Sequence, residues 1–145
     1  MKKTVFCLTW AIIMAVGLSI NSFAQESGSG EPDPEEMAEK QTDKLAKLLK
    51  LEDWQIFYVD STLRHDYTAM YGEMKVYQMQ RTTNSDIYIS IQDKYMEKID
   101  NKFKEVFNEE QWGKYLKNGA AKQQRDRQKR KEKAAKAAAR ILGDK

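Results

Sequence analysis

The sequence predicts an all-α protein, and three observations lead to that class. Apolar residues recur at helical intervals over long stretches, and the only two prolines stand at positions 32 and 34, so nothing downstream interrupts a helix. A short phrase also occurs twice, as Leu51–Gln55 and as Phe107–Gln111. Each copy begins with an apolar residue followed four places later by glutamine. The first copy precedes a long amphipathic stretch, and the second lies where the next such stretch ends. We expect an elongated four-helix bundle built from hairpins.

The first helix is expected to run from about Pro34 to Lys50. Asp33 is a good N-cap, and Pro34 suits the first helical position, where its missing N–H costs nothing. The residues on one side of this helix would be Met37, Gln41, Leu45, Leu48 and Leu49.

The second helix is expected to begin near Asp53 and to end near Arg81. Its apolar stripe, in steps of three and four, consists of Ile56, Val59, Leu63, Tyr67, Met70, Met74 and Tyr77. At 1.5 Å per residue such a helix is roughly 40 Å long. So long a helix in so short a chain favours an elongated body.

Thr82–Ser85 is a polar break, with Ser85 a candidate cap for a third helix that would reach about Val106. The stripe of this helix consists of Tyr88, Ile91, Tyr95, Ile99, Phe103 and Val106. The segment Ile87–Ile89 locally favours a strand, but the helical spacing downstream outweighs it.

A fourth helix should start at Asn108, where the repeated phrase has a physical meaning. Asn108 can accept from the backbone N–H of Gln111, while Gln111 reaches back to the N–H of Asn108, which is a capping box. Phe107 and Trp112 would form the hydrophobic staple. In the first copy Glu52 is a poor cap, so that helix start should be less well locked.

Residues 1–24 are typical of a cleavable signal peptide. Lys2–Lys3 form a charged start, Val5–Leu18 an apolar core, and Ser22–Ala24 a small-x-small cleavage signal. The apolar run is short for a membrane span, although a retained N-terminal anchor is the alternative. Such a signal peptide would direct the chain to a bacterial periplasm, and its cleavage would remove Cys7, the only cysteine.

The remaining chain divides into a flexible leader (25–33), a helical domain (34–118) and a basic tail (119–145). From Gln25 to Ala121 there are 13 Lys and Arg against 19 Asp and Glu, and from Lys122 to Lys145 there are 10 against 3. The tail is rich in good helix formers but has almost nothing to bury. We expect it to be a solvated extension, partly helical or disordered.

Signal peptide, four helices and two such phrases resemble the Spy/CpxP-like family of periplasmic proteins, whose motif is LTxxQ. Leu51 and Gln55 match the first motif, and Gln111 matches the second, with Phe107 in the place of leucine. Threonine is absent from both copies. The resemblance covers roughly residues 34–116.

The resemblance implies a cradle-shaped, antiparallel homodimer. Spy-like members are ATP-independent chaperones that hold unfolded clients on the concave face. CpxP-like members damp an envelope-stress sensor kinase, and other relatives bind zinc, nickel or cobalt.

Catalytic chemistry is not predicted, because the chain after position 24 has no cysteine, one histidine and no glycine-rich phosphate loop. His65 is a weak candidate metal ligand. Its helical neighbours three and four positions away include no carboxylate and no second histidine, so an ordinary histidine is favoured. We therefore predict no cofactor and no metal site.

Four large side chains lie off the main stripe of the second helix and are surplus to a single core face: Phe57, Tyr58, Tyr71 and Met79. Tyrosine and methionine are common on adaptable binding surfaces. Either a client-binding groove or a dimer interface would take them.

The basic tail has three interpretations. Its charge would attract nucleic acid, but export argues against that partner. It could contact an anionic membrane surface weakly, although it lacks a broad apolar face for insertion. It could also steer clients or keep the protein soluble.

The function predicted from the sequence is that of a periplasmic, ATP-independent holdase that binds unfolded or stress-damaged envelope proteins. The alternative is a regulatory binding protein of an envelope-stress sensor kinase, in a metal-responsive form or not. A purely structural envelope component is a third interpretation.

Overall fold

The computed structural model of this protein describes residues 33–143, and that part of the chain is helical with no strand. The helices are α1 (Pro34–Leu49), α2 (Asp53–Met79), α3 (Ser85–Val106), α4 (Glu109–Tyr115) and α5 (Ala121–Gly143), with a wide π-helical turn, η1 (Leu116–Ala120), before α5. The predicted all-α class is confirmed. The predicted signal peptide and all but the last residue of the predicted leader lie outside the described residues.

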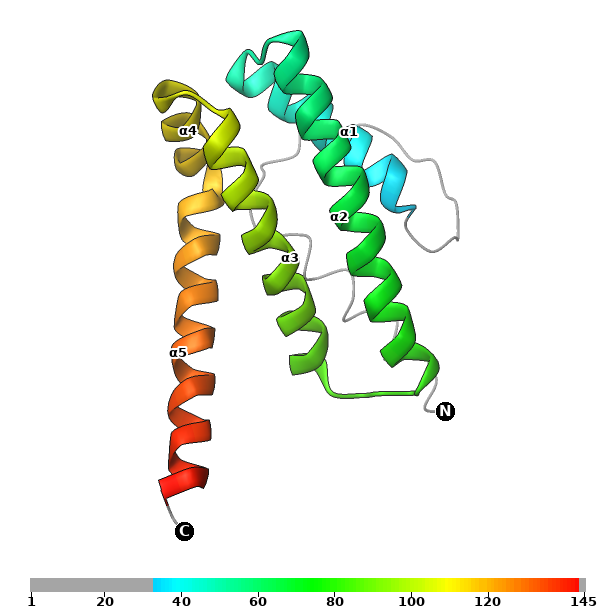
Figure 1. Ribbon diagram of the computed structural model, residues 1–145, viewed down its shortest axis with the longest axis vertical. Coiled ribbons are helices and arrows are strands. Elements are labelled where there is room, and N and C mark those ends of the chain that lie inside the picture. The colour runs from blue at the N-terminus through cyan, green and yellow to red at the C-terminus, as the bar shows by residue number, and fades with distance from the viewer. Residues whose placement is uncertain (1–32, 144–145) are drawn as a thin grey trace, which may run out of the picture.

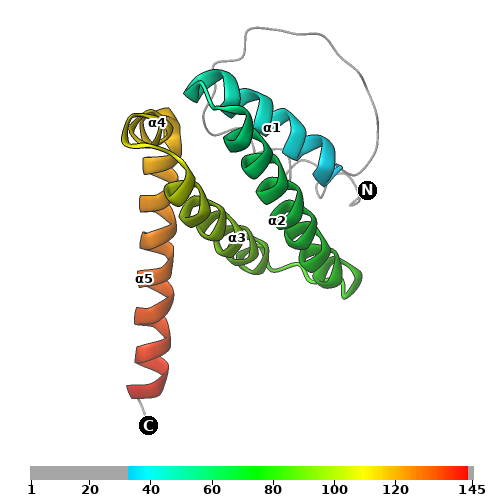
Figure 2. The same ribbon diagram turned by 45° about the horizontal axis from the view of Figure 1, so that its top comes forward.

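Figures 1 and 2 show that α1 folds back along α2 and that α2 and α3 form a long antiparallel hairpin. In both views α3 lies between α2 and α5, and the short α4 lies at the end of the molecule where α1 meets α2. Among residues 33–143, no helix combines the length and the apolar character that a membrane crossing needs.

Local capping explains where the helices begin. The Asp33 side chain accepts a hydrogen bond from the Glu35 backbone N–H at 3.0 Å, as the sequence predicted for α1. At α3 the cap is Asn84, which accepts from the Asp86 N–H at 3.0 Å, whereas Ser85 was expected there. Ser85 is already the first helical residue, and asparagine caps at least as well as serine.

The core follows the predicted stripes along α2 and α3, whereas in α1 Ala38 and Thr42 are buried in place of the expected Met37 and Gln41. The larger cluster joins α1, α2 and α3 near α4 and consists of Ala38, Leu45, Leu49, Val59, Leu63, Ile99, Phe103 and Phe107. A smaller cluster, Met70, Met74 and Ile91, lies between α2 and α3 farther along the hairpin. The strand tendency of Ile87–Ile89 is overridden, because these residues belong to α3.

The turn between α4 and α5 depends on one glycine. Asn118 leaves the helical region (φ −84°, ψ 23°), and Gly119 takes φ 112°, a conformation that side-chain-bearing residues rarely adopt. Through this break the chain turns from α4 into α5, and α5 then runs beside α3 (Figure 1).

Replacing Gly119 by alanine should destabilise the protein by about 1–2 kcal/mol, because a Cβ strains this backbone conformation. Gly72→Ala is the matched control: Gly72 lies inside α2 with open space where the methyl group of alanine would stand, so alanine there should be neutral or should stabilise by up to about 1 kcal/mol. Urea unfolding of both variants measures the difference. Equal effects would contradict the role given to Gly119.

Candidate functional site

The two glutamines of the repeated phrase bind each other. Gln55 Nε2 donates to Gln111 Oε1 at 2.8 Å, and Gln111 Nε2 donates to Gln55 Oε1 at 3.0 Å. Both residues are buried, at the starts of α2 and α4. Residues 56 positions apart therefore form one reciprocal amide pair.

Each glutamine also closes its own helix start. Gln55 Oε1 accepts from the Glu52 backbone N–H, and Gln111 Oε1 accepts from the Asn108 backbone N–H, both at 3.0 Å. The Gln111 N–H in turn donates to Asn108 Oδ1 at 2.9 Å, which completes the predicted capping box. Because backbone donors point at both side-chain oxygens, the orientation of each amide is set, and the two Nε2 groups remain for the pair.

The start of α2 is held more firmly than the sequence suggested. Gln55 Nε2 makes a second hydrogen bond, to the Val106 carbonyl at 3.0 Å, which ties α2 to the end of α3. The Glu52 carboxylate accepts from the Trp54 indole N–H at 2.8 Å. Of the apolar residues that open the two phrases, Phe107 belongs to the larger core cluster and Leu51 is partly buried and packs against that cluster.

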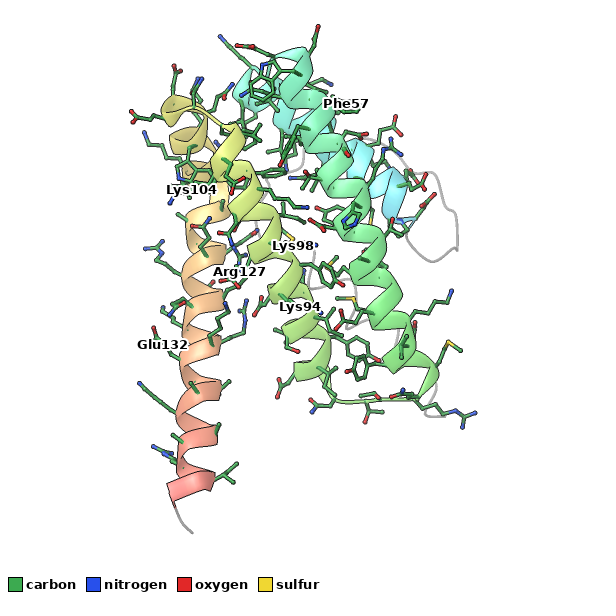
Figure 3. All side chains as sticks on the ribbon, viewed as in Figure 1. Phe57, Lys94, Lys98, Lys104, Arg127 and Glu132 are labelled. Atoms are coloured by element: carbon green, nitrogen blue, oxygen red, sulfur yellow. The ribbon has the colours of Figure 1, made fainter. Side chains whose placement is uncertain are left out.

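Three of the four surplus side chains lie on the surface of α2. Phe57 is 76% exposed, Tyr58 39% and Met79 78%. Trp54, which the sequence analysis did not select, is 56% exposed and lies one helical turn before Phe57 and Tyr58. Trp54, Phe57 and Tyr58 thus form an exposed aromatic patch at the start of α2; Figure 3 shows Phe57 at this end of the helix.

Tyr71 does not share this surface. It is half-buried, belongs to the edge of the smaller core cluster, and donates from its hydroxyl to Met37 Sδ at 3.1 Å. Burial raises the pKa of this hydroxyl. Tyr71 thus connects α2 to α1. Its partner, Met37, could not be predicted from the stripe of α2 alone.

His65 is exposed, and its Nδ1 lies 2.9 Å from Oδ1 of the buried Asp66. Asp66 also binds Lys98 and Lys102 of α3, each with Nζ 2.9 Å from a carboxylate oxygen. Within residues 33–143 no three His, Cys, Asp or Glu side chains are grouped so that they could hold a metal ion. The neighbourhood of His65 is an ion-pair cluster between α2 and α3.

The Asp66 carboxylate is held ionised. Burial raises its pKa, but hydrogen bonds from the two lysines and from His65 outweigh burial, so its pKa lies below the ordinary value of 3.8. The lysines are four residues apart on α3 and approach from one side (Figure 3 labels Lys98).

A second buried carboxylate, Asp100, joins α3 to α4 and α5. It accepts from the Tyr115 hydroxyl at 2.6 Å and from Gln124 Nε2 at 3.1 Å, and it forms an ion pair with the buried Arg127 (Figure 3). Burial raises the pKa of Tyr115 above its ordinary value, and the Asp100 carboxylate raises it further.

The first half of the basic tail is therefore attached to α3. Besides Arg127, Arg130 forms a bidentate pair with Asp93 at 2.6 and 2.7 Å, and Lys131 pairs with Glu97. These attachments are polar, because among residues 116–141 the only buried apolar residue is Ala120 at the end of η1. The expected solvated extension is therefore corrected at Arg127, which is buried, while Arg130 and Lys131 stay exposed and pair with the acidic face of α3.

No protein-family model, no curated protein and no solved structure matches this chain.

Sequence reasoning missed the two buried carboxylates. Asp66 and Asp100 lie among lysines and polar residues that are typical of solvated helix faces, and their partners include residues 24 and 36 positions away along the chain. The one available signal is weak: Lys98 and Lys102 stand four apart, as two donors to one facing group would. Trp54 was missed because tryptophan in the first turn of a helix is also consistent with core packing.

The glutamine pair should show coupling in a double-mutant cycle. Gln55→Ala and Gln111→Ala each leave a buried amide and a helix-start N–H without a partner, so each should cost about 2–3 kcal/mol of unfolding free energy. The double variant should cost at least about 1 kcal/mol less than their sum. Urea unfolding measures all four proteins.

Pairing Gln111→Ala with Gln78→Ala is the control for this cycle, because Gln78 lies exposed on α2 and should add independently. Strict additivity in the Gln55–Gln111 cycle would contradict the coupling.

The Asp66 cluster should make stability depend on pH. Because the pKa of Asp66 is lower in the folded protein, its contribution is present above about pH 4 and is lost as pH falls through the folded-state pKa. Chemical unfolding at pH 6 and near pH 3 should thus show a smaller loss of stability for Asp66→Asn than for the wild type. Asp43→Asn, which removes an exposed carboxylate from α1, should keep the wild-type loss. The same loss in all three proteins would refute this role.

Proposed function

We propose that this protein is a periplasmic, ATP-independent holdase of the Spy/CpxP-like type, which binds unfolded or stress-damaged envelope proteins. The observation that carries the proposal is the exposed aromatic patch of Trp54, Phe57 and Tyr58, with Met79 at the far end of the same helix. Exposed apolar side chains that lie together, rather than scattered singly, are typical of a binding surface.

The side chains of this patch suit clients without a defined shape. A fully buried phenylalanine gains about 1.5–3 kcal/mol over an exposed one, so each contact with a client is weak and reversible. Aromatic rings add a large contact area at a low cost in side-chain entropy. Binding and release of such segments needs no energy source.

Charge surrounds the patch and supports the same function. Glu52 and Asp53 are exposed at the start of α2, directly before the aromatic residues, and Lys50 is exposed at the end of α1. Charges of both signs at the edge of an apolar surface speed encounter and keep a loaded complex soluble.

The patch also lies on a well-anchored part of the molecule. Its helix start is bound to α4 through Gln55 and to α3 through the Val106 carbonyl. Because the backbone of this helix start is already hydrogen bonded, the position of α2 is fixed. The aromatic side chains therefore remain exposed instead of packing onto the core.

Truncating two of the three aromatic residues of the patch should abolish most of the holdase activity. Phe57→Ser combined with Tyr58→Ser should require about tenfold more protein to suppress the aggregation of an unfolding client, followed by light scattering, because the buried apolar contact is lost. The wild type should act near equimolar ratio. Ile141→Ser, which removes an exposed apolar residue from α5, is the matched control and should retain wild-type activity.

Unchanged aggregation in the presence of the wild type, for several clients and salt concentrations, would refute the proposal. Cross-linking in cells distinguishes the regulatory alternative, since a holdase should capture many envelope proteins and a regulator one membrane partner.

A further inference from the structure

Helix α5 has two different faces. One face is turned to α3 and carries the groups already described as its attachment: Gln124, Arg127, Arg130 and Lys131. At 100° per residue these four positions lie within about 120° of the helix circumference. Only three of the basic residues of α5 lie on this attachment face.

The opposite face carries a row of six further cations, which we name the cationic stripe: Lys122, Arg125, Lys129, Lys133, Lys136 and Arg140. Their spacing of three, four, four, three and four residues places all six within an arc of about 80°. The stripe is about 27 Å long at 1.5 Å per residue. All six side chains are exposed.

No acidic side chain among residues 33–143 forms an ion pair with the stripe, although other basic residues of the same helix are paired to α3. Two carboxylates flank it on α5, Asp126 and Glu132, and Glu132 accepts from Gln128 at 3.1 Å. Figure 3 shows side chains ending in nitrogen along the side of α5 that faces away from α3. The α3–α5 attachment therefore fixes the direction in which the stripe points.

We propose that the cationic stripe binds the surface of an anionic lipid bilayer through the phosphate groups of its lipids. Charge complementarity supports this partner, because a straight row of cations on a narrow arc can meet a flat, negatively charged surface with all its members at once. The attachment face stays bound to α3, so membrane binding by α5 would hold the rest of the protein at the membrane. This inference does not depend on the holdase function, because the aromatic patch of α2 takes no part in it.

The contact is peripheral. Between the cations α5 carries glutamine and acidic residues in its first half and alanine in its second half, and among residues 121–141 the one exposed large apolar residue is Ile141. A helix without a broad apolar face does not insert, so attraction comes from charge and weakens with salt. A nucleic acid offers phosphates too, but its single strands are held by aromatic stacking, and residues 121–143 contain no aromatic side chain.

Vesicle co-sedimentation of the full chain tests the proposal. At low ionic strength the protein should bind vesicles of equal parts phosphatidylglycerol and phosphatidylcholine more tightly than vesicles of phosphatidylcholine alone, and salt should remove the difference. Phosphatidylcholine vesicles also measure any binding by the apolar N-terminal segment. The triple variant Lys129→Gln, Lys133→Gln and Lys136→Gln should bind the anionic vesicles about 100-fold more weakly.

The matched control removes the same charge from exposed lysines elsewhere, by Lys44→Gln, Lys47→Gln and Lys117→Gln, and should stay within about twofold of the wild type. Circular dichroism should show the same helicity in both triple variants, because glutamine is a good helix former. Protection of an aggregating client should be unchanged in the stripe variant, which separates this inference from the holdase proposal.

Three results would overturn the inference: equal weakening by the two triple variants, no preference for anionic over zwitterionic vesicles, or tighter binding of a single-stranded oligonucleotide than of anionic vesicles at equal phosphate concentration. The last result would assign the stripe to nucleic acid.

Discussion

The reciprocal hydrogen bonds between Gln55 and Gln111 are the constraint on which the arrangement of the helices depends. Each amide satisfies a helix-start N–H with its oxygen and the other amide with its nitrogen, so two turns far apart in sequence are joined without a buried unsatisfied side-chain group among residues 33–143. In a protein whose core is small, such a pair matters for specificity as well as stability, because only one approach of the two helix starts satisfies both amides. From this junction α2 and α3 extend as the arms of a hairpin.

Along the arms of the hairpin, polar contacts do much to hold the helices together, whereas near the junction apolar packing does so. Asp66 is completely buried but neutralised by lysines from α3, and Asp100 gathers a tyrosine, a glutamine and an arginine from α4 and α5. A buried carboxylate is stable only with such partners, so these clusters fix which faces of the helices meet. The outer faces of α2 and α5 take no part in these clusters.

Those two outer faces differ in chemistry, and the proposals follow that difference. The outer face of α2 begins with an aromatic patch beside charged residues, which suits short-lived contacts with apolar segments of an unfolded chain. The outer face of α5 is a row of exposed cations without a broad apolar face, which suits a charged surface and not an apolar one. A protein with both could hold a client while it rests against a membrane, since the two faces belong to different helices.

The sequence by itself determined the features that are local. Helix boundaries came within about two residues of the expected ones, and the capping box at Asn108, the α2 and α3 stripes and the exposure of Phe57 and Met79 could be predicted, because all depend on neighbours within one or two helical turns. The repeated glutamine could be recognised as a helix start, but its partner could not. Tertiary structure alone decided that the two glutamines bind each other, that Tyr71 reaches Met37, that Asp66 and Asp100 are buried, and that half of the basic tail pairs with α3. Charged and amide side chains look the same in a sequence whether they face water or each other, and the contact that distinguishes them is made by residues from another helix.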